Sequence, residues 1–298
     1  LLTRHMTTRE HLQEVTTAIP RSKEQAESTL QTLIKNLYNR LFHHIVTRLN
    51  ENSLNGLDLH SEHTRHIGVL DIYGFEELQV NSLEQLCINL ANERLQNFFV
   101  EKMIQSEQET YKQEFIAWKN IDVKDTTEVR RCCERVLQTL NDECIKGFRG
   151  NLAKQAVSDD ATFTQNVVNS GNNYGILRYP KDVGRPREKK ADLAFVIKHY
   201  AGEVEYSTVD WIDKNNERMV PDLECMIRDS NSSIVQHLTD RDLCDLQSEK
   251  PRHASAFFLR ELDRLVSKTL GQCNLHFIRC FNPNARQVAK TFDKRYVL

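Results

Sequence analysis

The residues best suited to chemistry follow a short apolar run at residues 67–76 (IGVLDIYGFE). The run is typical of a buried strand that ends at the acid Asp71, and Gly74 frees the backbone just beyond it. In an α/β domain the carboxyl ends of strands open into the crevice where ligands bind, so Asp71 is a candidate ligand contact. Taken alone, such a pattern is more often a buried strand followed by an ordinary polar turn.

The composition sets the scale of the fold that must position this turn. The chain has 298 residues, of which 39% are hydrophobic, enough for the core of one large or two ordinary domains. Only 10 glycines and 6 prolines interrupt it and 28% of the residues are charged, which favours long helices with solvated faces. The formal net charge of −2 gives no global sign of a nucleic acid or an anionic membrane as partner.

The eight cysteines include no CxxC pair, which argues against a zinc ribbon or a redox dithiol and favours reduced thiols in a cytosolic protein. No apolar run reaches the roughly 18 residues that cross a bilayer, and no signal peptide opens the chain. Because the sequence starts at Leu1 and stops at Leu298, we expect a segment of something larger.

Two long helices dominate the predicted elements. The first begins at Ser22, where Gln25 completes a capping box, and carries one apolar stripe over residues 26–49, as in an ordinary core helix. The second begins at Ser82, where Gln85 completes another box, and runs through residue 111 before an aromatic cluster at residues 115–118. A rod of that length is a plausible mechanical lever or simply scaffold.

Shorter elements follow in the pattern. We predict helices over residues 125–147 and 159–165 and from residues 222 and 255, a hairpin of strands 193–200 and 203–206, and a strand at 275–281. Residues 1–20, 50–65, 169–190 and 243–254 are predicted to be irregular connections. His199 lies in the hairpin; a catalytic role is possible, but without a partner Cys, Asp or His in the local pattern we favour a structural histidine.

Five motifs stand in a fixed order between residues 71 and 284, and the resemblance that they carry extends over residues 2–292. Residues 71–76 (DIYGFE) and 81–96 (NSLEQLCINLANERLQ) resemble switch II and the relay helix of the myosin motor domain, with some unconventional character. Residues 199–206 (HYAGEVEY), 214–221 (KNNERMVP) and 276–284 (HFIRCFNPN) resemble three further myosin signatures. The resemblance implies an α/β, mostly helical fold, part of a P-loop NTPase-like motor head with a central mixed sheet and a long relay helix.

The resemblance also implies roles at the turn. Asp71 would reach the Mg²⁺ of bound ATP through water, since carboxylates suit a hard cation that dehydrates reluctantly. Gly74 would present its backbone N–H to the γ-phosphate, where a Cβ would obstruct the approach. Glu76 would pair with a switch I arginine outside this chain. The sequence contains no GxxxxGK[ST] P-loop, so parts outside the chain complete the ATP and Mg²⁺ site, and the piece alone should not hydrolyse ATP.

The implied partner is the actin filament. Residues 211–230 resemble an actin-binding helix-loop-helix, with Lys214, Met219 and Val220 as candidate contacts. Residues 243–254 correspond to loop 2, where Lys250 and Arg252 are candidates; so few cations argue against a strong electrostatic encounter with actin. Calmodulin-like light chains would bind outside this chain. No nucleic acid or transmembrane segment is implied, and the expected location is the cytoplasm, in association with the cytoskeleton.

The implied division is residues 1–65 before switch II, 66–120 with switch II and the relay helix, 121–242 as the lower actin-binding region, 243–254 as loop 2, and 255–298 as a helix and sheet strand. The implied function is a segment of an actin-based motor that couples ATP hydrolysis to movement along filaments. A motor-dead, myosin-like actin-binding or scaffold protein is the alternative. Three departures favour it: the absent P-loop, the few cations of loop 2, and Asn282 where the family motif ordinarily has lysine.

Overall fold

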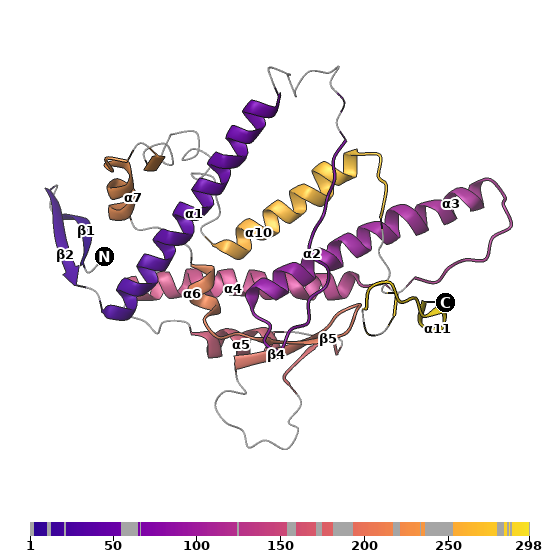
Figure 1. Ribbon diagram of the computed structural model, residues 1–298. Helices are drawn as coiled ribbons and strands as arrows, with labels where there is room; N and C mark the ends of the chain where they lie inside the picture. The colour runs from indigo at the N-terminus through magenta and orange to yellow at the C-terminus, as the bar shows by residue number, and fades with distance from the viewer. Residues whose placement is uncertain are drawn as a thin grey trace.

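The computed structural model describes residues 3–10, 13–20, 22–54, 65, 67–123, 125–153, 159–170, 175–180, 193–216, 221–232, 234–235, 253–278, 283–284, 286 and 288–297. The fold is mostly helical, as predicted (Figure 1). Its helices are α1 (Lys23–Leu54), α2 (Leu83–Phe99), η1 (Val100–Gln105), α3 (Ser106–Gln113), α4 (Thr127–Ala153), α5 (Asp160–Asn169), α6 (Trp211–Asn215), α7 (Pro221–Arg228), α10 (Ala254–Asp263), η3 (Arg264–Thr269), η4 (Leu270–Gln272) and α11 (Lys294–Val297). The strands are β1 (Thr3–Glu10), β2 (Gln13–Pro20), β3 (Leu177–Arg178), β4 (Ala194–Lys198) and β5 (Glu203–Ser207).

Helices α2, η1 and α3 form one continuous rod, confirming the second long helix. The rod begins as predicted: Ser82 is the N-cap, and its backbone N–H donates to Gln85 Oε1 at 2.9 Å. At ~1.5 Å per residue it is about 45 Å long, and Figure 1 shows its α3 end extending beyond the body of the molecule. There the Tyr111 and Trp118 rings meet edge to face at 5.0 Å, whereas Phe115 of the predicted aromatic cluster is 94% exposed.

The main core forms where α2 packs on α4 and on the β3-β4-β5 sheet. The sheet is antiparallel, with Ala194 opposite Ser207 and Lys198 opposite Glu203, which confirms the predicted hairpin. Strand β3 joins it from within the segment predicted to be an irregular connection. The fully buried side chains at this junction include Leu86, Leu90, Leu137, Leu140, Phe163, Phe195, Tyr206 and Trp211. The predicted helices at α4, α5, α7 and α10 are also confirmed.

Residues 1–20, predicted to be irregular, contain the hairpin β1-β2 instead. Its strands pair from Thr3 opposite Pro20 to Glu10 opposite Gln13. The prediction took the many threonines as a sign of a polar loop. Threonine is β-branched and fits an extended, pleated backbone, so a threonine-rich segment with polar neighbours also suits a hairpin.

The strand expected before Asp71 does not form. Residues 67–80 have no regular secondary structure, and Ile67 and Val69 are 99% and 90% exposed. Residues 275–278 of the second expected strand are likewise not in a strand, while 279–281 lie outside the described residues. A strand requires hydrogen bonds to a neighbouring strand, and no other described segment pairs with either run. The central mixed sheet is therefore not formed by the described part of the chain.

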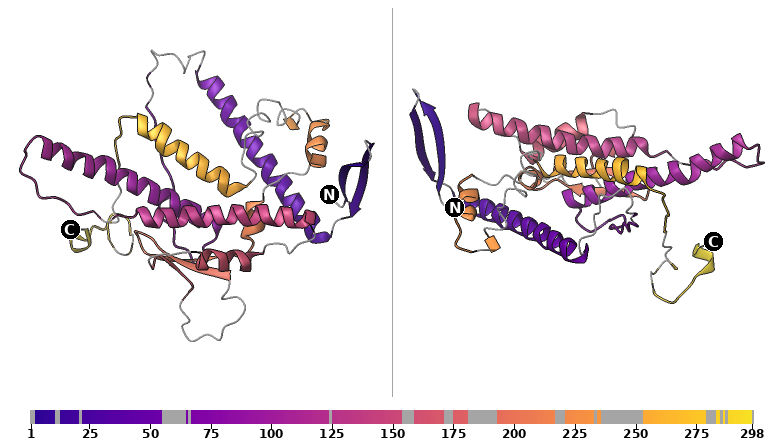
Figure 2. Two further views of the ribbon diagram at one scale, coloured as in Figure 1. Left: turned by 180° about the vertical axis from the view of Figure 1, so that it is seen from behind. Right: turned by 90° about the horizontal axis from the view of Figure 1, so that it is seen from above.

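Helix α1 confirms the first predicted helix but corrects its role. Only Leu33 of its apolar stripe is buried, against Leu223 and Ile227 of α7. The stripe residues Leu30, Ile34, Leu41, Ile45 and Leu49 are exposed. Seen from above in Figure 2, α1 lies apart from α4 and α10 rather than within the main core. The helical spacing of the apolar residues predicted a helix with one apolar face. It did not establish that another part of the described chain packs against this face. None of the described helices is long and apolar enough to cross a membrane.

Candidate functional site: the turn at residues 71–76 and the start of α2

The turn is tied to α2 by two asparagine side chains. The Glu76 backbone N–H donates to Asn89 Oδ1 at 2.8 Å, and Asn89 Nδ2 donates to the Glu76 carbonyl at 2.8 Å. One turn further along the helix, Asn92 Nδ2 donates to the Tyr73 carbonyl at 3.0 Å. Residues three apart share one face of a helix, so α2 holds the turn at two points along its backbone.

A buried polar network extends from Asn89 to the sheet. Asn89 Nδ2 also donates to the Tyr206 hydroxyl at 2.9 Å, and that hydroxyl lies 2.8 Å from His199 Nε2. His199 Nδ1 lies 3.1 Å from Glu93 Oε1, which also accepts from the Tyr200 backbone N–H at 3.0 Å. Burial raises the pKa of Tyr206 far above its usual value, so its hydroxyl keeps its proton. The network joins α2 to β5 and to the residues that directly follow β4.

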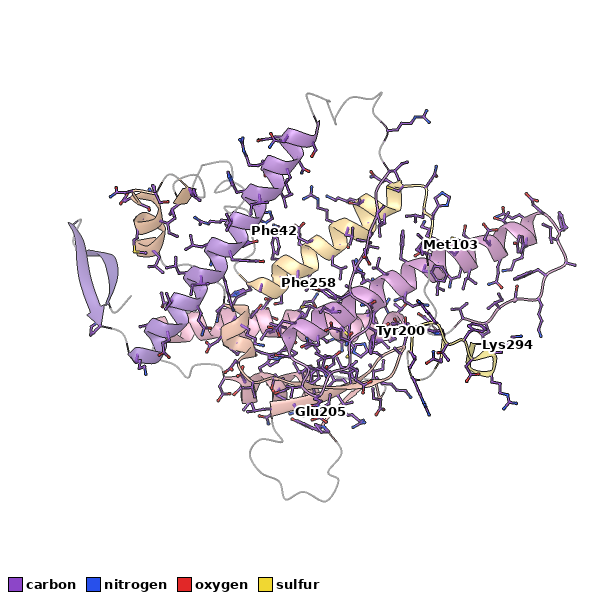
Figure 3. The ribbon with its side chains drawn as sticks, viewed as in Figure 1. Phe42, Met103, Tyr200, Glu205, Phe258 and Lys294 are labelled. Carbon is purple, nitrogen blue, oxygen red and sulfur yellow. The ribbon has the colours of Figure 1, made fainter. Side chains whose placement is uncertain are left out.

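His199 is a buried structural residue, as the sequence favoured. Its partner, Glu93, was not predicted, because only neighbouring positions in the sequence were considered. Glu93 lies on α2, far from His199 along the chain, so no spacing rule connects the two. The ring of Phe75 packs edge-on against both His199 and Tyr200, with centroids 5.3 and 5.7 Å apart. The turn is therefore held by α2 on one side and by the hairpin tip on the other; Figure 3 shows Tyr200 where the hairpin reaches α2.

The predicted ligand contacts lie on the open side of the turn. Asp71 and Gly74 are exposed, and neither has a hydrogen-bond partner among the described residues. A Cβ placed on Gly74 would meet nothing within 4 Å. The Glu76 side chain is half-buried, and its Oε2 accepts from Gln85 Nε2 at 3.3 Å. The Asp71 carboxylate and the Gly74 backbone N–H are thus available to a ligand, while Glu76 is anchored.

Lys214 lies at the first turn of α2. Its Nζ donates to Ser82 Oγ at 2.9 Å and forms an ion pair with Glu84 Oε2 at 3.0 Å. Partial burial acts to raise the pKa of the Glu84 carboxyl, but its backbone hydrogen bond, with the bond and charge of Lys214, holds that pKa below the usual value. Lys214 thus joins α6 to α2 in this structure. The other predicted actin contacts, Met219, Val220, Lys250 and Arg252, lie outside the described residues.

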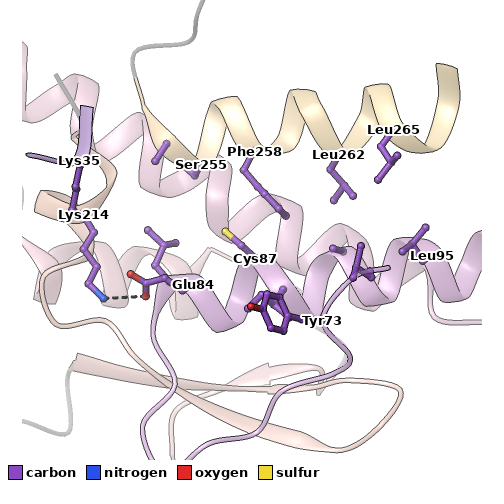
Figure 4. A pocket seen from close by; sticks show the side chains of 15 residues that line it. Lys35, Tyr73, Glu84, Cys87, Leu95, Lys214, Ser255, Phe258, Leu262 and Leu265 are labelled. Carbon is purple, nitrogen blue, oxygen red and sulfur yellow. Dashed lines mark hydrogen bonds and ion pairs between the residues drawn. The ribbon is translucent and has the colours of Figure 1, made fainter. Parts of the chain in front are cut away.

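A cavity of about 460 Å³ lies between α2 and α10, beside the turn (Figure 4). Tyr73 of the turn, Cys87 of α2 and Phe258 of α10 line it, together with further apolar side chains. Burial, together with the charge of Glu84, raises the pKa of the Cys87 thiol to about 12, so this thiol is protonated near neutral pH. The sequence did not predict the cavity, because its walls come from segments far apart in the chain.

Comparison with known proteins matches this sequence to myosins. The family model "Myosin head (motor domain)" matches residues 1–298. The chain is 36% identical over 291 residues to the myosin type-2 heavy chain 2 of Schizosaccharomyces pombe, covering 93% of this chain and 13% of the relative. It is 34% identical over 284 residues to the myosin IB heavy chain of Dictyostelium discoideum, covering 94% of this chain and 24% of the relative.

A third relative, the unconventional myosin-Ic-A of Xenopus laevis, is 31% identical over 290 residues, covering 92% of this chain and 26% of the relative. The chain therefore spans about a quarter or less of the length of these relatives. The match over the whole chain shows that this chain belongs to the myosin head (motor domain) family.

Proposed function

We propose that this chain is the part of an actin-based motor that couples ATP hydrolysis to movement along actin filaments. The observation that carries the proposal is the clamp of Asn89 on both backbone atoms of Glu76. It connects the turn whose motif resembles switch II directly to a rigid helix of the relay type. In the complete head, a P-loop NTPase-like central sheet would be completed by segments outside the described residues.

The turn is suited to the nucleotide end of this coupling. Phosphoryl transfer depends mainly on positioning and on electrostatic stabilisation. The exposed Asp71 carboxylate would hold Mg²⁺ through water, and the exposed Gly74 N–H would donate to the γ-phosphate of ATP. When bound, Mg²⁺ neutralises charge on the phosphates. Mg²⁺ usually keeps several waters and is held by one or two carboxylates together with phosphate oxygens, so Asp71 would be sufficient as its ligand from this chain.

Glu76 would close the site. Its carboxylate would pair with a switch I arginine outside this chain, while Gln85 holds its Oε2 and Asn89 holds its backbone. Because Asn89 and Asn92 lie on α2, a change in the turn that opens or closes the site displaces the start of the rod. The rod would carry that displacement to the aromatic contact of Tyr111 and Trp118 at its far end.

The actin end of the coupling is proposed for the segment around α6 and α7. Met219 and Val220 lie between α6 and α7 in the sequence and are candidate contacts, as are Lys250 and Arg252 in loop 2. Lys214 is a candidate at the edge of this surface, and its ion pair with Glu84 would transmit a displacement of α6 to the first turn of α2. We also propose light chains outside this chain and a cytoplasmic, cytoskeletal location.

The test uses the complete protein. A working motor hydrolyses ATP, is activated by actin, and releases actin when ATP is added in a cosedimentation assay. Actin binding that ATP does not weaken, together with no ATPase activity, would instead identify the motor-dead actin-binding alternative. A complete protein without any P-loop would exclude hydrolysis by this route, since nothing else in the proposed site cradles the phosphates.

A further inference from the structure

We propose that Tyr206 is a positioning residue for ATP hydrolysis: its hydroxyl fixes the orientation of the Asn89 amide and, through it, the backbone of the turn at residues 71–76. Tyr206 lies on β5, in a different part of the fold from the turn and from α2. The inference rests on the proposed function and adds the hairpin to it as a third body that controls the turn.

The first step is that Asn89 uses both hydrogens of its amide nitrogen and also accepts through its amide oxygen. One Nδ2 hydrogen goes to the Glu76 carbonyl and the other to the Tyr206 oxygen, while Oδ1 accepts from the Glu76 N–H. A rotation of the amide by 180° would set Oδ1 against the Glu76 carbonyl and Nδ2 against the Glu76 N–H. Both contacts with the turn would then be repulsive, so the orientation of this one amide decides whether the clamp exists.

The second step assigns a direction to the other bonds of the network. The Tyr206 oxygen accepts from Asn89, and in the proposed arrangement its single hydrogen is given to His199 Nε2, 2.8 Å away. His199 Nε2 is then an acceptor, so the ring proton is on Nδ1 and is donated to Glu93 Oε1. Glu93 also accepts from the Tyr200 N–H, which keeps its oxygen facing the ring. Donation therefore runs one way, from Asn89 to Glu93.

The third step is the burial of the network, because a buried group that loses its hydrogen-bond partner is costly. Asn89, Glu93 and Tyr206 are completely buried and His199 nearly so, so a group that loses its partner here cannot turn to bulk water. Without the Tyr206 hydroxyl, one Asn89 hydrogen and His199 Nε2 both lose their partners. Only the two bonds to Glu76 of the turn then orient the Asn89 amide. The amide therefore no longer has a support that is independent of the turn.

The test compares Tyr206→Phe with Phe195→Leu in the complete motor. Phe195 is buried on the neighbouring strand with its ring centroid 5.7 Å from that of Tyr206, but it has no polar atom in the network. Tyr206→Phe should slow the hydrolysis step in a single turnover about tenfold, as expected for a buried group without its partner, and leave the rate of ATP binding within about twofold. Phe195→Leu should lower thermal stability without slowing hydrolysis.

A second pair of variants tests the other end of the network. Glu93→Gln retains an acceptor oxygen for the His199 and Tyr200 N–H groups, whereas Glu93→Leu does not. We expect hydrolysis to be about tenfold slower in Glu93→Leu than in Glu93→Gln. This pair decides the matter if Tyr206→Phe does not fold.

The outcomes separate the inference from the proposed function. A wild-type protein without ATPase activity overturns both. An active wild type in which Tyr206→Phe hydrolyses ATP as fast as Phe195→Leu, or in which the two Glu93 variants are equal, overturns the positioning role alone. A defect of Tyr206→Phe in ATP binding as large as that in hydrolysis also overturns it, since the turn is required to close after the nucleotide has bound.

Discussion

The side chain of Asn89 contacts Glu76 as one peptide group contacts another, accepting from its N–H and donating to its carbonyl, both at 2.8 Å. Two parallel bonds fix direction as well as distance, so the end of the turn cannot rotate without moving the helix. Asn92 adds a third bond, to the Tyr73 carbonyl. Coupling between the turn and α2 therefore passes through backbone atoms, and changes in the turn's exposed side chains need not break it.

Asn89→Asp should slow ATP hydrolysis about a hundredfold. The carboxylate can still accept from the Glu76 N–H, but it faces the Glu76 carbonyl without a hydrogen to donate and brings an unpaired charge into a buried site. Single-turnover hydrolysis in the complete protein measures the effect. Asn36→Asp is the control, because the Asn36 amide donates to Thr32 of its own helix α1. Equal rates in the two variants would rule out the clamp.

Gly74→Ala should leave the fold intact and still slow hydrolysis, by about a hundredfold, in the range seen when one backbone donor to a developing charge is lost. The structure leaves space for the added methyl group, since a Cβ at Gly74 meets nothing within 4 Å. Thermal unfolding measures the first effect and steady-state ATPase activity the second. Gly68→Ala, whose Cβ also has open space, is the matched control. Unchanged turnover in Gly74→Ala would refute the role of the Gly74 N–H.

The sequence predicted the helices and the hairpin well, because these elements are determined by neighbours within a few residues. The capping pair Ser82 and Gln85 and the apolar spacing along α2 required nothing from the rest of the chain. The strand before Asp71 failed for the opposite reason. Its apolar residues are typical of a buried strand, but burial and pairing depend on neighbours that the described chain does not supply.

At the candidate site, too, the features carried by neighbouring residues were predicted and those that depend on distant segments were not. The turn and Gly74 were recognised as a motif, and the structure leaves Asp71 and Gly74 open to a ligand. The residues that hold the turn were not recognised, because in the sequence Glu93 and His199 are ordinary members of a predicted helix and a predicted hairpin, and only the fold brings them to 3.1 Å. Glu93 carried one weak signal: it is an acid on the apolar side of a predicted helix, where a buried charge requires a partner.

Lys214→Met and Glu84→Gln, singly and together, should reduce actin activation of the ATPase to a similar extent, with no further loss in the double variant. The reason is that both changes break the same ion pair between α6 and the first turn of α2. The pair is partly exposed, so each change should alter the free energy of unfolding by less than about 1 kcal/mol. The exposed pair Arg48 and Glu51 on α1 serves as the control.

A different result would identify a different role for Lys214. If Lys214 acts only as a direct actin contact, Lys214→Met weakens actin activation while Glu84→Gln leaves it unchanged. The dependence of ATPase rate on actin concentration distinguishes the two cases. The coupling described above requires the single effects to be non-additive, as for any two residues that share one interaction.

Asp159→Ala should lower the free energy of unfolding by about 1 kcal/mol, the usual contribution of an N-cap side chain. Asp159 caps α5, accepting from the Thr162 backbone N–H at 2.8 Å, and this bond lowers the pKa of its carboxyl. A carboxyl whose pKa is lower in the folded state stabilises the fold above its ordinary pKa, and the effect is lost as pH falls through the folded value. The difference between Asp159→Ala and wild type in urea unfolding should therefore shrink below about pH 4. An equal difference at pH 3 and pH 7 would contradict the cap.

Cys87 should resist alkylation in the folded protein, although it lines a cavity. With a pKa of about 12, only about one molecule in ten thousand carries the thiolate at pH 8, against some tenth to a quarter for an ordinary thiol. Iodoacetamide should therefore label the exposed Cys225 at least a hundredfold faster, as measured by peptide mass spectrometry.

Since the folded pKa of Cys87 is raised above the unfolded one, the contribution of Cys87 to stability is complete below about pH 8 and is lost as pH rises from about 9 towards 12. Cys87→Ala should remove that part of the alkaline loss. Labelling of Cys87 at the rate of Cys225 in the folded protein would show that the thiol is not held in the apolar wall between α2 and α10.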